Sequence, residues 1–257
     1  MIVLIIDAHT HYGIGLNFPF RAKTIDDMVM VMDKYGVDMA CISSAYALLH
    51  DCPEGNRRLY EAIKLYPSRF IPFCAVNPRY LDEARDELRK YIKENGWKGV
   101  KLHPELHHYM ANCEASIAIM EEIDKLNVPV LIHSGDPHMY GFYSRLDLIA
   151  ELAGMYPETP IILGHMGITA WLDAIELAKK HLNLLLDTSG SCYSYGMVEL
   201  AVEELGAERV VFGSDFAELN LPVELSKVMD SDISDEAKNL VLGGNIARII
   251  GLKGGNQ

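Results

Sequence analysis

Residues 2–15 read IVLIIDAHTHYGIG, in which five aliphatic residues stop at Asp7 and are followed by His9 and His11. A short, β-branched-rich apolar run of this kind predicts a buried strand over residues 2–7. Residues two apart in an extended chain point to the same side, so both imidazoles face one way where this strand runs out. This arrangement suits two ligands on one metal ion, and the rest of the chain decides whether further ligands exist.

The same alternation of a short apolar run and a longer amphipathic segment recurs along the whole chain. Eight strand–helix units in about 250 residues predict an α/β fold, a single (β/α)8 TIM barrel over residues 1–257. An open doubly wound sheet is the alternative, and it is disfavoured because no glycine-rich phosphate loop follows the first strand. We expect Thr24 and Asn56 to begin helices as N-caps. The predicted strands are 2–7, 37–43, 69–76, 98–102, 128–133, 159–164, 182–187 and 209–214, and the predicted helices are 24–35, 56–66, 80–94, 114–126, 144–155, 169–180, 195–205, 221–229 and 235–250.

Composition narrows the class of protein. The 257 residues are 49% hydrophobic and 23% charged, with a formal net charge of -13, so the basic excess of a nucleic-acid-binding protein is missing. Five scattered cysteines favour a reducing compartment over a disulfide framework. No apolar run approaches the length of a membrane span, and the aliphatic run at the start is too short for a signal peptide. We therefore expect a cytoplasmic protein that acts on a small molecule.

Metal-compatible side chains stand at the carboxyl ends of five predicted strands, the end at which such barrels build their active sites. Their recurrence on five separate strands indicates one shared site. Each also has a structural interpretation: Lys101 as an ion-paired lysine, His103 as a strand-end polar group, Asp7 as a support for the first strand. The residues are His9 and His11 after strand one, Lys101 and His103 after strand four, His133 after strand five, His165 after strand six and Asp215 after strand eight.

Together these residues resemble the amidohydrolase superfamily, specifically the amidohydrolase-2 family. The resemblance covers nearly the whole chain and is carried by IDAHTH (6–11), YPSRFIPFCAVNP (66–78), GWKGVKLHP (96–104), VPVLIHSG (128–135), IILGHMG (161–167), VVFGSDF (210–216) and LGGNIARIIGL (242–252). It implies a distorted (β/α)8 barrel that holds a divalent metal, usually zinc. Members of this family are often homodimers.

The resemblance also implies roles for individual residues. His9, His11, His133 and Asp215 match the ligands of a single metal. His165 matches a histidine that binds a second metal in some members and polarises substrate or water in others. The last position is Lys101, which ligates a second metal only if it is carboxylated.

Two reactions fit this set of residues. In the favoured one, a zinc-activated water hydrolyses an amide, ester or lactone, with Asp215 as proton acceptor and His165 as donor to the carbonyl oxygen. The alternative is non-oxidative decarboxylation of an aromatic or unsaturated acid, in which Asp215 and His165 move a proton to carbon. A non-catalytic, ligand-binding barrel is a third class, disfavoured because no ligand is missing.

Substrate-binding residues are predicted from the loops. A decarboxylase needs cations to hold the carboxylate of its substrate, and Arg21, Arg57 and Arg145 lie on or beside the loops. His103 and His138 are further candidates for contact with substrate.

Overall fold

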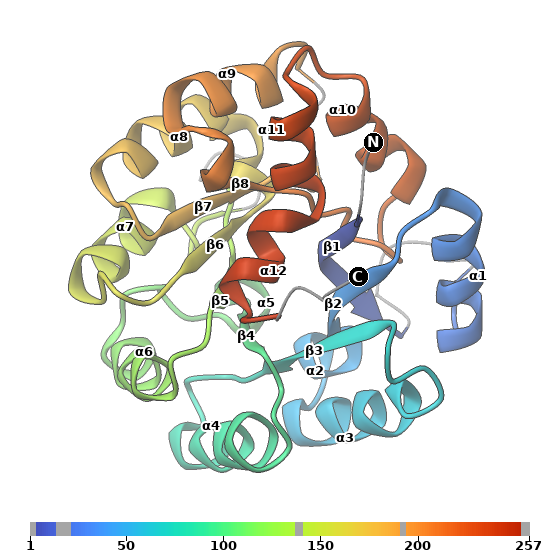
Figure 1. Cartoon of the computed structure of the whole chain (residues 1–257). Coiled ribbons are helices and arrows are strands. Elements are labelled where there is room, and N and C mark those ends of the chain that lie inside the picture. Colours follow the sequence, from blue (N-terminus) through green and yellow to red (C-terminus); the bar gives the residue numbers. More distant parts are fainter. Residues whose placement is uncertain (1–3, 14–21, 137–140, 191–193, 253–257) are drawn as a thin grey trace.

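The computed structural model describes residues 4–13, 22–136, 141–190 and 194–252. Eight parallel strands pair in chain order and curve into a barrel surrounded by helices (Figure 1), which confirms the predicted fold class. The strands are β1 (Ile6–Tyr12), β2 (Met39–Ser44), β3 (Phe70–Ala75), β4 (Gly99–Leu102), β5 (Val130–His133), β6 (Ile161–Gly164), β7 (Leu184–Asp187) and β8 (Val210–Val211).

The barrel is closed by contacts between β1 and the segment that follows β8. The Ala8 amide donates to the Phe212 carbonyl at 2.8 Å, and the Asp215 amide donates to the His9 carbonyl at 2.8 Å. The residues after Val211 therefore bond to the first strand and do not extend β8 to residue 214 as predicted. This closure places Asp215 directly beside the histidines of β1.

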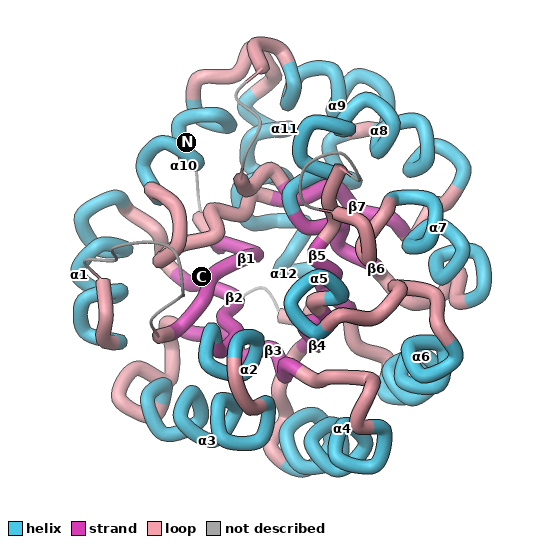
Figure 2. The backbone as a smooth tube through the Cα atoms, turned by 180° about the vertical axis from the view of Figure 1, so that it is seen from behind, coloured by secondary structure: helices cyan, strands magenta, loops and turns pink. Residues whose placement is uncertain are grey.

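Helices pack around the strands, and two short ones lie over the carboxyl end of the barrel. The short helices α2 and α5 were not predicted; Figure 2 shows them on the face opposite to α12. The α-helices are α1 (Ile25–Tyr35), α2 (Ala45–Leu49), α3 (Cys52–Ile63), α4 (Leu81–Glu87), α5 (Pro104–His107), α6 (Glu114–Leu126), α7 (Leu146–Met155), α8 (Trp171–Lys180), α9 (Met197–Leu205), α10 (Leu221–Met229), α11 (Asp235–Asn239) and α12 (Asn245–Ile249). Other helical turns are η1 (Leu88–Glu94), η2 (His165–Ala170), η3 (Ala207–Arg209) and η4 (Leu240–Gly244).

The hydrophobic core has an inner and an outer part. Inside the barrel, side chains near the amino ends of the strands pack with Ile246 and Ile250 from α12 and the residue after it. Helix α12 thus plugs the amino end, as its position across the ring of strands in Figure 1 shows. The outer and larger core lies between strands and helices. The carboxyl end of the barrel, free of this plug, is left for polar side chains.

Two predictions about element boundaries are wrong in an informative way. Strand β1 includes His9 and His11, because Thr10, His11 and Tyr12 pair with β2, and His9 lies where this pairing shifts register between Asp7 and Thr10. Thr24 caps α1 as predicted, but Asn56 lies inside α3, whose N-cap is Asp51. Asn56 is buried and bridges β3 to α4: its amide nitrogen donates to the Ala75 carbonyl at 2.9 Å and to Glu87 at 2.8 Å.

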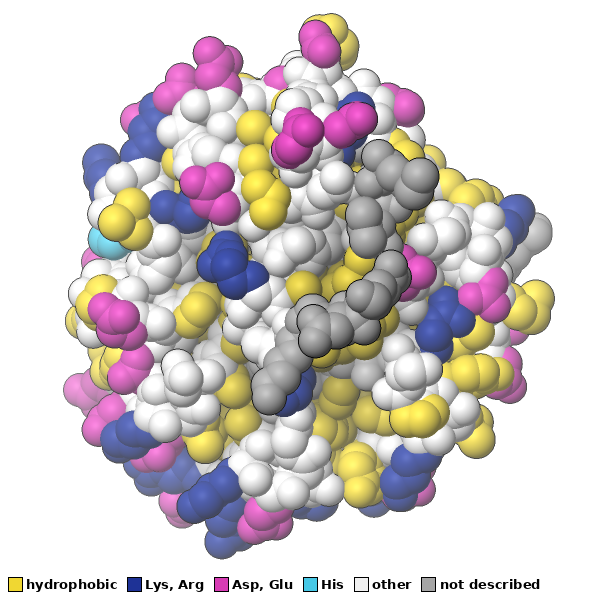
Figure 3. All heavy atoms as spheres, viewed as in Figure 1, with side chains coloured by type: hydrophobic (Ala, Val, Ile, Leu, Met, Phe, Trp, Pro, Cys, Tyr) yellow, Lys and Arg dark blue, Asp and Glu magenta, His cyan; other side chains and the backbone are white. Residues whose placement is uncertain are grey.

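The amino end of the barrel carries charges of both signs. Lys, Arg, Asp and Glu side chains are mixed around the rim of the face drawn in Figure 3. A groove of about 910 Å³ is lined by side chains from η1, α6 and α12, among them Arg248, and by Trp97 and Lys98 from the segment between η1 and β4. It lies at the end opposite to the strand-end histidines and is therefore separate from the candidate site. No helix in the described ranges combines the length and apolar character needed to cross a membrane.

Replacing Asn56 tests its bridging role. Asn56→Ala leaves the amide and carbonyl of Ala75 and one Glu87 oxygen without their buried partner, so we expect the free energy of unfolding to fall by about 2–4 kcal/mol. Urea denaturation measures this, with the exposed Lys180→Ala as a control that we expect to change stability by less than about 0.5 kcal/mol. Equal losses in both variants would contradict the bridging role.

Glu87 makes stability depend on pH. Burial raises the pKa of Glu87 from its ordinary value, although Asn56 donates to it. The stability that the carboxyl contributes is therefore complete below its unfolded pKa of about 4.3 and is lost as pH rises through the raised folded value. We expect the free energy of unfolding of Glu87→Gln, relative to that of the wild type, to increase as pH rises from acid to mildly alkaline values. Urea unfolding at each pH measures this difference. A difference in stability that stays constant with pH would contradict this.

Candidate metal centre

Three ligand atoms converge at the closure of the barrel. The Nε2 atoms of His9 and His11 are 3.2 Å apart. The Oδ1 atom of Asp215 lies 3.1 Å from His11 Nε2 and 3.5 Å from His9 Nε2. All three side chains are buried, although they come from opposite ends of the sequence.

The spacing of these atoms fits a metal ion. Four-coordinate zinc with bonds of about 2.0–2.1 Å holds neighbouring ligand atoms about 3.3 Å apart. The three distances between His9, His11 and Asp215 match this edge length, and two imidazoles with a carboxylate are a donor set that divalent metals accept. The residues therefore fit a divalent metal at this point.

Both imidazoles are held by their other nitrogen. The Ser43 hydroxyl lies 2.9 Å from His11 Nδ1, and Asp187 Oδ2 lies 2.7 Å from His9 Nδ1. Burial, with a contribution from Lys101, lowers the pKa of His11 to about 4 and that of His9 well below its ordinary value. Both rings are therefore neutral near pH 7, which is the form that binds a metal.

Lys101 is a fully buried amine beside the three ligand atoms. Its Nζ lies 2.8 Å from His9 Nε2, and burial lowers its pKa to about 8. A lowered pKa makes the neutral amine, the form that reacts with CO2, more accessible. Carboxylation of Lys101 itself stays a prediction.

His133, His103 and His165 form a second histidine cluster next to the first. The His103 and His133 rings stack at 4.0 Å between centroids and an angle of 11°, and His165 meets His133 edge-on at 4.8 Å. His103 also caps α5, since its Nδ1 accepts from the Leu106 amide. Neither group of potential metal ligands among the described residues includes His133, so its role as a ligand stays a prediction.

The backbone is strained at the two residues predicted to be catalytic. Asp215 has a φ of 55° and His165 a φ of 63°. The left-handed conformation costs a residue with a Cβ about 1–2 kcal/mol. Strain of this kind persists where the surrounding structure fixes it, and it gathers at functional sites.

The predicted substrate cations lie elsewhere or outside the described residues. Arg145 pairs with Asp147, its neighbour in α7, and Arg57 pairs with Glu54 of α3. Both arginine side chains are exposed to solvent, as expected for ordinary surface ion pairs. Arg21 and His138 fall outside the described residues.

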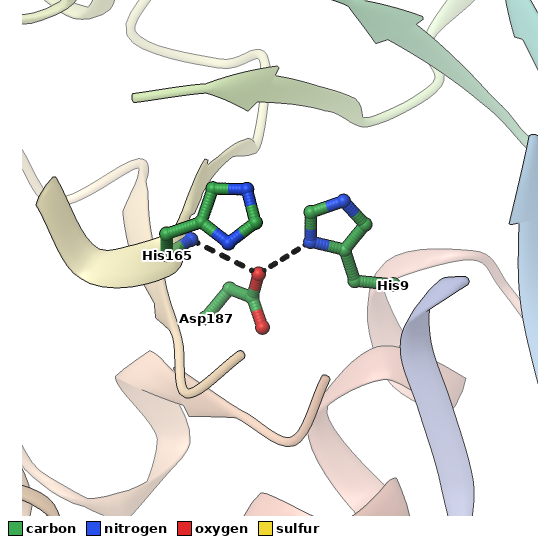
Figure 4. Close-up of side chains that lie close together, drawn as sticks. All are labelled: His9, His165 and Asp187. Atoms are coloured by element: carbon green, nitrogen blue, oxygen red, sulfur yellow. Dashed lines mark hydrogen bonds and ion pairs between the residues drawn. The ribbon is translucent and has the colours of Figure 1, made fainter. Parts of the chain in front are cut away.

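Sequence reasoning missed three side chains at the site. Asp187 ends β7 and, with His9 and His165, forms a second group of potential metal ligands (Figure 4). The strand-end rule applied to the seventh strand would have found it. Ser189 lies within hydrogen-bond distance of both histidines, and Glu218 follows Asp215 by one turn, where burial raises its pKa and His11 opposes that rise.

The chain matches the amidohydrolase family over residues 6–252. It therefore belongs to the amidohydrolase family, as the sequence motifs indicated. The barrel, its metal-compatible group at the carboxyl ends of the strands and the family match all agree.

Several similar proteins are decarboxylases. In an alignment of 285 positions, the chain is 24% identical to a γ-resorcylate decarboxylase from Rhodococcus jostii (strain RHA1). The alignment covers 87% of this chain and 86% of the relative. It shares its fold with the 5-carboxyvanillate decarboxylase from Sphingomonas paucimobilis, with a TM-score of 0.79, 16% identity and coverage of 97% and 99% of the two chains. A dihydroxybenzoic acid decarboxylase from Polaromonas sp. JS666, with bound manganese and the inhibitor 2-nitroresorcinol, gives a TM-score of 0.75 at 19% identity, over 97% of each chain.

Metal content tests the first group of ligands. We expect about one equivalent of divalent metal per chain after reconstitution with zinc or manganese, because one group has the spacing of metal ligands. His11→Ala should lose it, whereas His181→Ala, at the opposite end of the barrel, should keep it. Elemental analysis of the dialysed proteins measures both. Retention of the metal by His11→Ala would contradict the assignment.

Proposed function

We propose that this protein is a metal-dependent, non-oxidative decarboxylase of a hydroxylated aromatic carboxylic acid. The observation that carries the proposal is the convergence of His9, His11 and Asp215 in a chain whose relatives, over most of their length, are aromatic-acid decarboxylases. The substrate class follows from the names of these relatives and is part of the proposal.

The relatives support the second of the two reactions that the sequence allowed. The motifs alone favoured hydrolysis, because a metal, a carboxylate and a histidine suit the attack of water on a carbonyl group. The same side chains suit proton transfer to carbon, so the ligand set does not separate the two reactions. Similarity to decarboxylases makes hydrolysis the competing outcome of the test.

His9, His11 and Asp215, with His133 from the predicted set, would hold the metal. A bound divalent cation would act as a Lewis acid that binds and orients the anionic oxygens of the substrate. Zinc is the prediction from sequence, and manganese is present in a similar structure, so both belong in the test.

The proton for the ring carbon comes from the buried acid and histidine. Without a metal, burial raises the pKa of Asp215, and His165 and Lys101 oppose this rise; Asp215 would therefore hold the metal through one carboxylate oxygen and carry the proton on the other. Asp215 gives its proton to the ring carbon that bears the carboxylate, and His165 is the second proton carrier at this point. The carbon–carbon bond then breaks, its electron pair restores the aromatic ring, and CO2 leaves.

Lys101 supplies positive charge where an anionic acid would bind. Its buried amine lies next to His9 and, with a pKa of about 8, is mainly protonated at pH 7, whereas Arg57 and Arg145 are engaged by carboxylates on the surface. We infer that Lys101 attracts the substrate anion into the site, in place of an arginine on a loop.

An assay for released CO2 and for the phenol tests the reaction. With γ-resorcylate or 5-carboxyvanillate in D2O, we expect a product with one deuterium at the carbon that lost the carboxylate. Asp215→Asn should lower kcat by about 100-fold or more, because the proton donor is lost. His181→Ala, the control, should stay within about twofold of wild type.

Two results would contradict the proposal. One is metal-loaded protein that releases no CO2 from a panel of hydroxylated benzoates. The other is hydrolysis of amides, esters or lactones that depends on Asp215, which would restore the reaction favoured by sequence alone.

A further inference from the structure

Asp187 is a buried carboxylate that accepts hydrogen bonds on both of its oxygens. Its Oδ2 lies 2.7 Å from His9 Nδ1, 2.5 Å from Ser189 Oγ and 3.2 Å from the His165 amide. Its Oδ1 accepts from the Ser189 amide at 2.9 Å. Figure 4 shows the carboxylate between the two imidazoles. Asp187 therefore contacts both the first predicted metal ligand and the second proton carrier.

The number of available protons determines which atoms donate and which accept in these hydrogen bonds. A carboxylate can only accept, so His9 Nδ1 must donate to Asp187. The single hydroxyl proton of Ser189 goes to Asp187, the nearest acceptor. Ser189 Oγ therefore has only lone pairs to offer His165 Nδ1, which lies 3.1 Å away, so this nitrogen also carries a proton.

We propose that Asp187 and Ser189 are positioning residues that hold both His9 and His165 in the tautomer protonated at Nδ1. Nε2 of each ring is then the basic nitrogen, and in Figure 4 it points away from Asp187. His9 Nε2 faces His11 and Asp215, at the predicted metal position. The inference rests on the proposed function for the presence of that metal.

Two glycines leave the space that this arrangement needs. A Cβ on Gly213 would lie 2.1 Å from Asp187 Oδ1 and 2.8 Å from the Cβ of His9. Gly190, with a φ of +86°, would place a Cβ 2.6 Å from His165 Nδ1. Neither position has room for a side chain, so the backbone is packed closely around the carboxylate and the two rings.

A largely buried ion pair holds the loop that carries Ser189. Lys227 Nζ lies 2.7 Å from Glu224 Oε2 and donates to the Gly190 carbonyl at 2.6 Å. The Gly190 amide donates to the same Glu224 oxygen at 3.0 Å. Helix α10 therefore fixes the backbone that follows β7 through its contacts with Gly190. This limits the movement of Asp187 and Ser189.

These contacts also distinguish the chemical roles of the two groups of potential metal ligands. The distance of 2.7 Å between His9 Nδ1 and Asp187 Oδ2 is that of a hydrogen bond, shorter than the separation of about 3.3 Å between neighbouring zinc ligands. A metal in the group of His9, His165 and Asp187 would displace the protons that these bonds require. His9, His165 and Asp187 are therefore not a second metal centre. They support the centre formed by His9, His11 and Asp215.

The test uses Asp187→Asn and Ser189→Ala in the full chain labelled with 15N-histidine. An asparagine has only one acceptor oxygen, so it cannot serve His9 Nδ1 and the Ser189 amide together. In metal-free protein, long-range 1H–15N correlation spectra report the tautomer of each ring, and loss of signals in His9→Gln assigns His9. We expect Nδ1–H on both rings in wild type, loss of that form on His9 in Asp187→Asn, and loss on His165 alone in Ser189→Ala.

Zinc affinity, measured by competition with a chromophoric chelator, gives a second readout. We expect Asp187→Asn to bind zinc about 10- to 100-fold more weakly, since partners of this kind tune a ligand's affinity. His181→Ala is the control, because His181 follows α8 at the amino end of the barrel, away from both rings. It should leave the tautomers unchanged.

The outcomes separate this inference from the proposed function. Wild-type tautomers in both variants would overturn the positioning role, and Ser189→Ala, which keeps the carboxylate, decides the matter if Asp187→Asn does not fold. The expected tautomers in a protein that decarboxylates nothing would uphold the positioning role and reject the function.

Discussion

The contact between the first strand and the segment after the last one is the constraint on which the site depends. Asp7 accepts from the Ser214 amide at 3.0 Å, and the Asp215 amide donates to His9. Burial raises the pKa of Asp7 to about 8, and its hydrogen bonds to Ser214, at the far end of the chain, oppose this rise. Without this closure, His9 and Asp215 would stand at opposite edges of an open sheet. With it, they share one point at the end where barrels of this kind carry out chemistry.

The order of the elements could be predicted from the sequence because apolar runs and amphipathic segments alternate with a clear period. The failures are local. Strand β1 continues through His9 and His11, since β2 pairs with it again from Thr10 to Tyr12 after a shift in register. The four- and five-residue helices α5 and α2 are too short to show a helical period. Asn56 was interpreted as a cap, although its amide bonds to β3 and Glu87, partners that sequence alone does not place nearby.

The candidate site was predictable wherever a polar residue ends a strand and follows an apolar run. This pattern identified His9, His11, Lys101, His133, His165 and Asp215. Asp187 fits it as well and was overlooked, whereas Ser189 and Glu218 reach the site only through the path of the backbone after β7 and β8. For Arg57 and Arg145 the prediction was wrong in the other direction. Sequence suggested that they bind substrate, but each pairs with a carboxylate close to it in the chain. The sequence therefore shows which side chains the strands place at the site, but not which hydrogen-bond and ion-pair partners those side chains have.

Fold and ligands leave the choice of reaction to the loops, since one barrel supports many chemistries. One structural feature underlies the proposed chemistry, namely a single metal held by His9, His11 and Asp215. Anomalous X-ray diffraction at the manganese or zinc edge, from crystals of the metal-loaded protein, tests it directly. The account predicts one strong peak in contact with the Nε2 atoms of both histidines and with Asp215. A peak between His165 and Asp187, two peaks, or none in protein shown to be metal-loaded would contradict it.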